Sequence, residues 1–461
     1  MTDLLLSAAG RHVYNGRLFR PLPSPAMTDS EKIHRAQLFQ ASELLALILG
    51  GTMPADKQME LYFRNNRQMG KRDRGFVAET VYGCLRRLRL LETLAGELLP
   101  GESGKRAETL IATYLLAFAG WAGRTLEGKG FMSNTSALVT QVRTVDRKSF
   151  SFAIRANLPD WLAERLLAQF GEEEAMQLAD ALNQPATLDL RINPHKATRE
   201  QVMARLAEEG FPVEPMRYSP LGIRRNDRAP LFTLASFKAG WFEVQDEGSQ
   251  LISMLVAPHK REQVIDFCAG AGGKTLHLAA LMENSGSVFA FDISERRLDN
   301  LRPRLARAGV DNVRTQLIRD EHDKLLKKFL ERADRVLVDA PCSGTGTVRR
   351  NPDIKWRPID LKALRTTQLS ILEAAARLVK PGGRLVYATC SLLKEENDDI
   401  VAAFLAAHSE FVIIPASEVL AAQGVVIDDG FTAEGAMRLL PHLHGTDGFF
   451  AAVMERKTQS M

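Results

Sequence analysis

Two of the four cysteines in this 461-residue chain come within four residues after short apolar runs. Cys342 comes after the run 336–338, and Cys390 comes after the run 385–387. Apolar, β-branched runs of this kind predict strands, so we expect each thiol just past a strand end, where α/β sheets bind ligands. Because the thiolate is a nucleophile, the pattern predicts sulfur chemistry at this edge of a sheet. Two inert, buried cysteines would be the alternative.

A glycine-rich turn marks a second candidate site. A predicted strand at 264–267 leads into Cys268-Ala269-Gly270-Ala271-Gly272-Gly273-Lys274 and then into a predicted helix. Glycines let the backbone come close to a ligand. The turn is not a phosphate-binding P-loop, because position 268 is cysteine where that motif needs glycine. It is not a full dinucleotide fingerprint either, because Thr275 stands where the third glycine belongs.

Acidic residues follow the neighbouring predicted strands. Asp266 ends the first strand, Asp292 ends the second, and Asp320 follows the third. A carboxylate after the second strand can accept both hydroxyls of a ribose, and a polar side chain after the third can meet an adenine amino group. The pattern therefore predicts a pocket for the nucleoside half of S-adenosylmethionine. Solvated loop acids are the alternative.

The candidate sites lie in a predicted doubly wound α/β domain at 239–457. Strands are expected at 264–267, 288–291, 313–318, 336–338 and 385–388, with 411–414 and 449–454 completing the sheet. Helices are expected at 275–282, 294–308, 323–331 and 361–379. This alternation of strand and helix is typical of a Rossmann-like parallel sheet.

Further modules are expected ahead of this domain. Residues 155–238 alternate between strand and helix patterns and predict a small α+β domain, whereas 29–150 predict an all-α domain. Residues 1–28 are expected to be a disordered extension. A basic patch is expected on the helical domain and could hold phosphates; its members are Arg64, Arg67, Lys71, Arg72, Arg74, Arg86, Arg87 and Arg89.

The composition excludes several classes of protein. Hydrophobic residues make up 45% and charged residues 25% of the chain, as in ordinary globular proteins. No apolar run approaches the roughly 20 residues that cross a bilayer. Four irregularly spaced cysteines argue against a disulfide framework, so a reducing, cytoplasmic location is expected. No metal is expected, because His442 and His444 lack a nearby acid cluster.

Four segments, in this order, resemble the Fmu/RsmB branch of the RNA cytosine-C5 methyltransferases. They read FCAGAGGKT at 267–275, DAPCSGTG at 339–346, RRNPD at 349–353 and YATCS at 387–391. The segment VQDEGSQ at 244–250 and the closing 440–450 are also similar to that family. The resemblance spans roughly 155 to 455, and the helical module resembles the NusB-like RNA-binding domain of bacterial members. The family's turn often has Ala-Pro where this chain has Gly270-Ala271.

The resemblance implies a Rossmann-like methyltransferase domain preceded by an RRM- or ferredoxin-like α+β domain and the NusB-like domain. It assigns Cys390 as the nucleophile that adds to carbon 6 of cytosine and Cys342 to product release. Asp339 would face N3 and the amino group of the base, and the Pro341 carbonyl would accept from that amino group. DNA cytosine methyltransferases use a Pro-Cys cysteine instead, which would make Cys342 the nucleophile.

The resemblance also implies S-adenosylmethionine as cofactor and RNA as partner. The implied cofactor contacts are Asp266, Cys268, Ala269, Gly270, Ala271, Gly272, Gly273, Lys274, Asp292, Arg297, Asp320 and Asp339. Arg349, Arg350 and Lys355 are expected to contact RNA phosphates. The expected substrate is 16S rRNA, with tRNA or a non-catalytic RNA-binding role as alternatives, and the expected state is a monomer.

Overall fold

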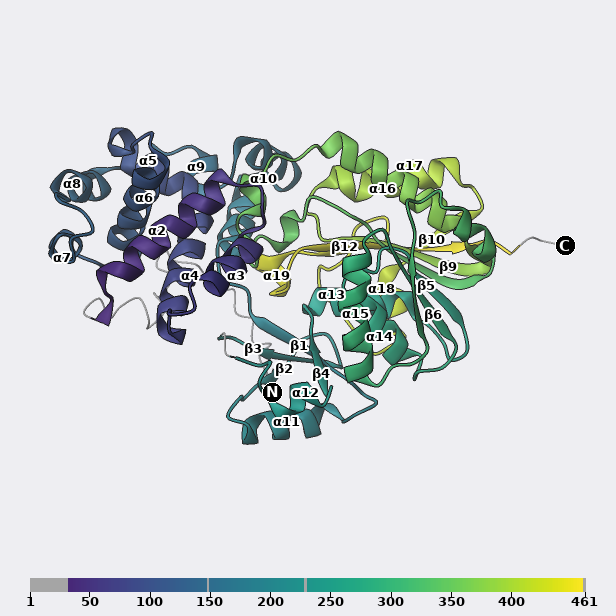
Figure 1. Cartoon of the computed structure of the whole chain (residues 1–461). Helices are drawn as coiled ribbons and strands as arrows, with labels where there is room; N and C mark the ends of the chain where they lie inside the picture. Colours follow the sequence, from purple (N-terminus) through teal and green to yellow (C-terminus); the bar gives the residue numbers. More distant parts are fainter. Residues whose placement is uncertain (1–31, 147–148, 228–229, 459–461) are drawn as a thin grey trace, which may run out of the picture. The chain divides into compact units, whose positions relative to one another are not determined.

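The computed structural model describes residues 32–146, 149–227 and 230–458 (Figure 1). The extension expected at 1–28 lies outside the described residues. The chain divides into two compact units, residues 1–150 and 151–461. Across the described residues, no helix is long and apolar enough to cross a membrane.

The first unit is helical. Its α-helices are α2 (Arg35–Gly50), α3 (Ala55–Asn65), α4 (Lys71–Arg86), α5 (Leu88–Ala95), α6 (Ser103–Phe118), α7 (Gly123–Gly128) and α8 (Ser136–Thr144). Helix α2 packs against α4 and α6. Fully buried side chains such as Leu38, Leu45 and Phe76 form the contacts, and burying each stabilises the unit by about 1.5–3 kcal/mol.

The basic patch expected on this unit is smaller than its sequence indicates. Arg86 and Arg87 are only 6% and 4% exposed. The Arg86 guanidinium lies 5.6 Å from the Tyr82 ring, and that of Arg87 lies 4.9 Å from the Phe118 ring. Both arginines lie at the junction of α4 and α5, where they face aromatic rings of the same unit. We therefore remove them from the exposed patch.

The second unit contains two sheets. The smaller is antiparallel, with the order β2-β3-β1-β4. Its strands are β1 (Leu188–Ile192), β2 (Glu214–Pro215), β3 (Gly222–Arg225) and β4 (Phe242–Val244). The helices in this part of the chain are α9 (Phe152–Ala156), α10 (Asp160–Leu182), α11 (Arg199–Glu208) and α12 (Ala235–Lys238).

The larger sheet has the order β10-β12-β9-β8-β5-β6-β7, with β11 paired to β12. Its strands are β5 (Gln263–Asp266), β6 (Ser287–Asp292), β7 (Val313–Leu317), β8 (Ala333–Asp339), β9 (Val379–Thr389), β10 (Phe411–Ile414), β11 (Met437–Leu439) and β12 (Phe449–Arg456). The five strands from β9 to β7 in this order are parallel, and β12 is antiparallel to β9. The expected fold class, a Rossmann-like α/β sheet preceded by a helical region, is confirmed.

Helices cover both faces of the larger sheet (Figure 1). Val336 and Val338 pack on the face covered by α16 (Leu361–Ala376) and α17 (Asp398–Ala407). Leu337, between them, packs on the opposite face with α13 (Glu247–Val256), α14 (Gly273–Leu281) and α18 (Ala416–Ala421). This alternation follows from the two-residue period of a strand, and burial on both faces explains the unbroken apolar run.

Two expected helices differ from the structure. The segment expected at 323–331 forms the 3-10 helix η4 (Lys324–Phe329), where the Asp323 carboxylate accepts from the Leu325 N–H at the start. The helix expected at 361–379 ends at Ala376, because β9 already begins at Val379. Helix α15 (Glu295–Ala308) lies within a residue of its expected bounds.

Candidate active site

The two loops that carry Cys342 and Cys390 leave neighbouring parallel strands at the same edge of the sheet. Asp339 of β8 lies opposite Ala388 of β9, and the Ala340 N–H donates to the Ala388 carbonyl at 2.8 Å. The carboxyl ends of parallel strands share one edge. The sulfur atoms of Cys342 and Cys390 lie 3.4 Å apart, within hydrogen-bond distance.

The environment of Cys342 favours its protonated form. A hydrogen bond with the Cys390 thiol, burial, and the negative charges of Cys390 and Glu396 raise the pKa of Cys342 well above its usual value. A thiol that keeps its proton can donate a hydrogen bond to a neighbouring thiolate. Both thiols are partly exposed.

A partly buried ion pair lies beside the thiols. The Lys274 ammonium donates to the Asp339 carboxylate at 2.6 Å, and the lysine side chain is 11% exposed. Burial lowers the pKa of Lys274, but the negative charges of Asp339, Cys390 and Asp266 outweigh burial and raise the pKa. Lys274 therefore stays positively charged, close to Cys390. The site thus combines a nucleophile, a cation and a carboxylate.

The glycine turn has the backbone that its sequence indicates. Gly270 and Gly272 have φ angles of 56° and 81°, which favour glycine. A Cβ atom on Gly272 would lie 2.1 Å from a Leu301 methyl carbon. A Cβ atom on Gly270 would have no described atom within 4 Å. The turn therefore packs tightly on α15 at Gly272 and is open at Gly270.

Asp292 lies against this turn at the end of β6. Its carboxylate accepts from the Gly270 N–H and the Ser294 N–H, each at 2.8 Å. The side chain is 4% exposed, and the Arg297 guanidinium lies 3.8 Å away. Each carboxylate oxygen keeps a further acceptor position, so Asp292 fits two neighbouring hydroxyl groups.

The buried carboxylate of Asp266 shows which kind of ligand fits beside the glycine turn. The Thr275 hydroxyl donates to its Oδ2 at 2.7 Å, while Oδ1 is buried and, among the described residues, has no hydrogen-bond donor. Burial and the negative charges of Asp339 and Asp292 raise the pKa of Asp266 to about 7, against the hydrogen bond from Thr275. A ligand with a cationic donor and vicinal hydroxyls, such as S-adenosylmethionine, fits Asp266 and Asp292.

The other predicted cofactor residues lie in different environments. Ala269 is buried and Ala271 is exposed within the turn. Cys268 packs against the core below it, and burial, with nearby carboxylates, raises the pKa of its thiol. Gly273 begins α14. Asp320 is exposed and accepts from the His322 N–H at 2.8 Å, which is the arrangement of a solvated loop acid.

The three cations expected to contact RNA are held in internal contacts. Lys355 is 0% exposed, and its ammonium donates to the Asn157 carbonyl and the Asn183 side chain at 2.7 and 2.9 Å. Arg349 is 6% exposed and donates to Asp447 at 3.1 Å. In this conformation Lys355 and Arg349 present no charge to solvent.

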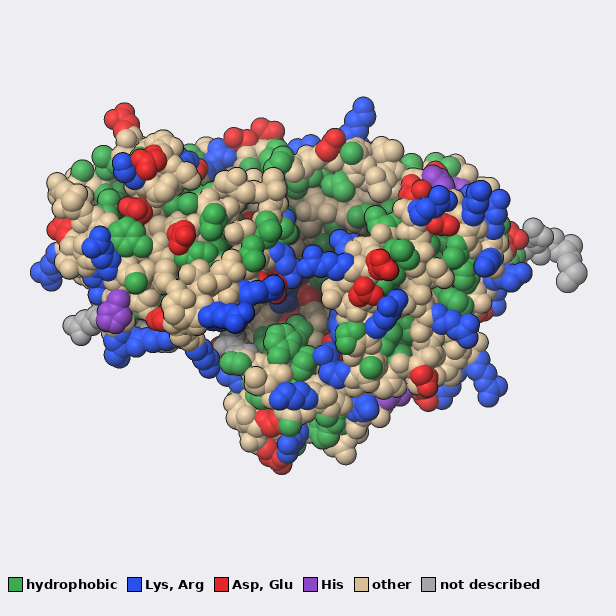
Figure 2. Space-filling model, viewed as in Figure 1, with side chains coloured by type: hydrophobic (Ala, Val, Ile, Leu, Met, Phe, Trp, Pro, Cys, Tyr) green, Lys and Arg blue, Asp and Glu red, His purple; other side chains and the backbone are tan. Residues whose placement is uncertain are grey.

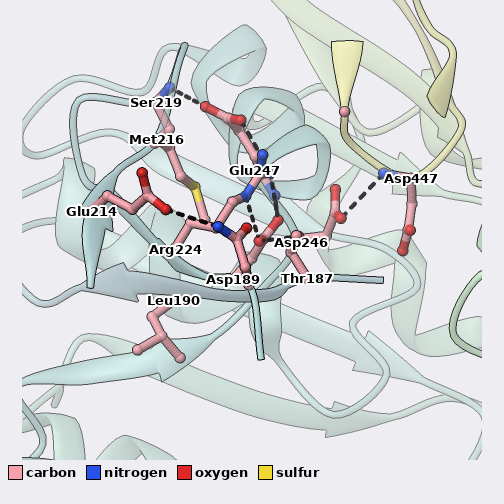
Figure 3. A network of polar contacts seen from close by, with 12 residues as sticks. Thr187, Asp189, Leu190, Glu214, Met216, Ser219, Arg224, Asp246, Glu247 and Asp447 are labelled. Carbon is pink, nitrogen blue, oxygen red and sulfur yellow. Dashed lines mark hydrogen bonds and ion pairs between the residues drawn. The ribbon is translucent and has the colours of Figure 1, made fainter. Parts of the chain in front are cut away.

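Arg350 belongs to a larger network, which we call the carboxylate–arginine cluster. Its members are Asp189, Arg224, Asp246, Glu247, Arg349, Arg350 and Asp447. Figure 3 shows the part of it formed by Asp189, Arg224, Asp246, Glu247 and Asp447. Arg350 donates to Asp447 at 2.5 Å and to Asp246 at 2.7 Å. Arg224 donates to Asp189 at 2.8 and 3.0 Å. The cluster joins the smaller sheet to loops of the larger one.

Glu396 is a site residue that the sequence patterns did not single out. It is fully buried at the end of η7 (Lys394–Glu396) and contacts both thiol loops. Its position six residues after Cys390, followed by Asn397, was the signal available in the sequence. His442 and His444 are held elsewhere: His444 accepts from the Leu440 N–H at 2.9 Å, and His442 lies 3.5 Å from Glu174.

Comparison with known proteins gives matches over most of the chain. Residues 253–455 match the family model of the 16S rRNA methyltransferase RsmB/F, and residues 158–231 match the ferredoxin-like domain of the RsmF/B-like methyltransferases. A probable ribosomal RNA small subunit methyltransferase B from Synechocystis sp. is 33% identical over 412 residues, covering 83% of this chain and 91% of the relative. The namesake from Bacillus subtilis is 36% identical, covering 66% and 68%.

Solved structures are similar as well. The crystal structure of PH0851 superposes with a TM-score of 0.75 and 27% identity, covering 92% of this chain and 99% of that chain. A methyltransferase homologue from Pyrococcus horikoshii has a TM-score of 0.57 and 29% identity, covering 68% and 100%.

Proposed function

The chain belongs to the RsmB/F family of RNA methyltransferases, which use S-adenosylmethionine, and we propose that it methylates carbon 5 of a cytosine in 16S rRNA. The observation that carries the proposal is the pair of thiols 3.4 Å apart beside the Lys274–Asp339 ion pair. Carbon 5 of cytosine is a poor nucleophile, and a thiolate that adds to carbon 6 makes it a good one. The rRNA substrate is inferred from relatives named as small-subunit methyltransferases.

In the first step, the Cys390 thiolate forms a bond to carbon 6 of the base. The electron pair of the C5–C6 double bond moves into the ring and makes carbon 5 nucleophilic. The Cys342 sulfur lies 3.4 Å from that of Cys390, where its thiol can donate to the thiolate, and Lys274 places a positive charge nearby. When bound, S-adenosylmethionine would supply the methyl group to carbon 5, with cleavage of its sulfonium S–CH3 bond and release of S-adenosylhomocysteine.

In the last step, the carbon 5 proton leaves as the C6–S bond breaks. The electrons of the C5–H bond restore the double bond, and the electrons of the C6–S bond return to Cys390 as a thiolate. A water molecule held by Cys342 takes the proton, so that one proton is released per methyl group transferred. Without Cys342, the adduct at carbon 6 would persist.

Asp339 and Pro341 provide the preference for cytosine. Lys274 donates to Oδ2 of Asp339. The other carboxylate oxygen can accept from the amino group and from the proton that N3 takes up as negative charge develops in the ring during addition. The Pro341 carbonyl accepts from Gln368 at 2.9 Å and keeps a second lone pair for the amino group. Uracil has an oxygen, O4, in place of the amino group, so two hydrogen-bond acceptors, O4 and the Pro341 carbonyl, would face each other.

The helical unit is proposed to bind RNA through its exposed cations. Arg64, Arg67, Lys71 and Arg72 are exposed around the end of α3 and the start of α4. Figure 2 shows Lys and Arg side chains on the surface of this unit. Cations of this kind neutralise phosphates without reading sequence.

The test is to incubate the full-length protein with S-adenosylmethionine and either 16S rRNA or tRNA, and to analyse the nucleosides. We expect 5-methylcytidine in 16S rRNA. Binding of rRNA without product would favour a non-catalytic RNA-binding protein, and product only in tRNA would reassign the substrate. Both results would contradict the proposal.

A further inference from the structure

Glu396 is a buried carboxylate whose hydrogen-bond donors are all uncharged. Its Oε1 accepts from the Ser343 N–H at 2.8 Å and from Gln368 at 3.0 Å. Its Oε2 accepts from the hydroxyls of Ser343 and Ser391, each at 2.5 Å. Among the residues that the structure describes, no lysine or arginine pairs with it. We call Glu396, Gln368, Ser343 and Ser391 the thiol clamp.

Each partner of Glu396 is attached to one of the reactive loops. Ser343 follows Cys342 in the chain, and Ser391 follows Cys390. Gln368 also donates to the Pro341 carbonyl at 2.9 Å. One carboxylate therefore contacts both thiol loops at the residues next to the two sulfur atoms.

Neighbouring contacts hold Glu396 itself in place. The Tyr387 hydroxyl of β9 donates to the Glu396 carbonyl at 2.7 Å. The next residue, Asn397, accepts from the Thr389 hydroxyl at 2.5 Å and donates to the Ser391 carbonyl at 2.9 Å. The carboxylate is thus fixed relative to β9. Its hydrogen bonds to Ser343 hold the loop after β8 at a fixed distance from β9.

The charge of Glu396 is unfavourable for stability by itself. A buried carboxylate loses hydration, which hydrogen bonds from neutral groups offset only in part. Apolar packing would stabilise the same space at lower cost. Fully satisfied polar networks, by contrast, specify one geometry. The arrangement is what a reaction with two thiols acting on one base requires.

We propose that Glu396 is a positioning residue, which holds the Cys342 and Cys390 loops at the separation where both thiols reach the same base. The inference rests on the proposed function for its chemical purpose. The geometric part, a fixed separation of the sulfur atoms, is independent of any substrate.

Two substitutions separate reach from charge. Glu396→Gln keeps the length of the side chain, and its amide can donate to the serine hydroxyls, which also act as acceptors. Glu396→Asp keeps the negative charge, but its side chain is one CH2 group shorter, so the carboxylate no longer reaches both loops. The same two substitutions at Glu395 are matched controls, because Glu395 lies in the same 3-10 helix and pairs with Arg165 at 2.8 Å.

The first readout needs no substrate. Phenylarsine oxide bridges two nearby thiols, with formation of two As–S bonds and release of one water. Intact-mass analysis and peptide mapping would follow the bridge between Cys342 and Cys390, with Cys390→Ala as the unbridged reference. We expect bridging in the wild type, in Glu396→Gln and in both Glu395 variants, and at least about tenfold slower bridging in Glu396→Asp. Equal rates in Glu396→Asp and the wild type would overturn the inference.

The second readout is turnover. A displacement of about 1 Å can cost roughly 100-fold in rate, so kcat should fall that far in Glu396→Asp and less in Glu396→Gln. The affinity for S-adenosylmethionine should stay within about twofold, because Glu396 contacts neither Asp266 nor Asp292. Full turnover in Glu396→Asp with a dead Glu396→Gln would show that charge matters instead of position.

The two readouts keep the inference apart from the proposed function. Bridging could be lost in Glu396→Asp while the wild type makes no 5-methylcytidine. This result would support the positioning role of Glu396 and contradict the proposed methylation of cytosine. A wild type that makes 5-methylcytidine, with bridging and turnover unchanged in Glu396→Asp, would reject the positioning role alone.

Discussion

The thiol clamp and the carboxylate–arginine cluster are both buried polar networks in the second unit, but they are built differently. In the cluster, carboxylates face guanidinium groups, as in the Arg350 contacts to Asp246 and Asp447 at 2.7 and 2.5 Å. In the clamp, the Glu396 carboxylate faces hydroxyls, an amide and a backbone N–H. The cluster joins distant segments, whereas the clamp adjoins two reactive sulfur atoms. We therefore expect the charge pairs to stabilise the fold and the neutral hydrogen bonds to position the two thiols.

The largest effect is expected at the thiols. Cys390→Ala should lower methyl transfer by at least about 10³-fold, because no nucleophile remains to activate carbon 5. Radiolabelled methyl transfer to 16S rRNA measures the loss. The free energy of unfolding should change by less than about 2 kcal/mol, since only the sulfur atom of one side chain is removed. Residual turnover near the wild-type rate would assign the nucleophile to another residue.

A substitution in the carboxylate–arginine cluster should mainly lower stability, whereas Cys390→Ala mainly lowers turnover. Arg350→Ala should lower the free energy of unfolding by about 3–5 kcal/mol, because the buried Asp246 and Asp447 carboxylates lose their positively charged partner. Denaturant unfolding measures the change. Arg302→Ala is the control, since its partner Asp299 is exposed and such pairs contribute about 0–1 kcal/mol. Equal effects of the two variants would remove the stabilising role of the cluster.

Asp292 tests whether the thiols act separately from cofactor binding. Asp292→Ala should weaken S-adenosylmethionine binding by about 1–3 kcal/mol through the lost hydroxyl contacts. Calorimetry measures the affinity, and Asp299→Ala on the exposed face of α15 is the control. The rate of arsenical bridging between Cys342 and Cys390 should be unchanged. An unaltered affinity would place the ribose elsewhere.

The smallest effect concerns the pH dependence of stability. Burial and the negative charge of Asp447 raise the pKa of Asp246 to about 7, against the attraction of Arg350. A carboxyl group whose pKa is raised by folding binds its proton more tightly in the folded state. Deprotonation of Asp246 alone should therefore lower the free energy of unfolding by about 1 kcal/mol between about pH 6 and 7.5.

Asp246→Asn should reduce this decline in denaturant titrations at several pH values. It should not abolish the decline, because the pKa of Asp266 is also raised to about 7, mainly by burial. A wild-type stability that rises over the same interval would contradict the assignment.

The difference between the two networks also explains what the sequence could predict. Cys342, Cys390, Asp292 and the glycine turn all lie within a few residues of strand ends, and the pattern of strands places those ends together. The alternation of β5 to β9 with helices was predicted for the same reason, since local apolar periodicity records burial.

The cluster could not be predicted from local patterns. Arg350 and its partner Asp447 are separated by 97 residues, and Lys355 and Asn157 by 198. Charges after a catalytic loop therefore indicated phosphate contacts, although Arg349 and Lys355 are buried. The sequence patterns did not indicate Glu396, because its partners Ser343, Ser391 and Gln368 come from two loops and one helix. Only the folded chain brings these three segments together.

The central claim is that Cys342 and Cys390 act in turn on one cytosine. The most direct measurement is denaturing electrophoresis of Cys342→Ala after incubation with 16S rRNA and S-adenosylmethionine, followed by mass mapping of any linked peptide. We predict a denaturation-resistant protein–RNA complex linked through Cys390 and absent from Cys390→Ala. A complex that forms in Cys390→Ala through Cys342, or no complex in either variant, would contradict the account.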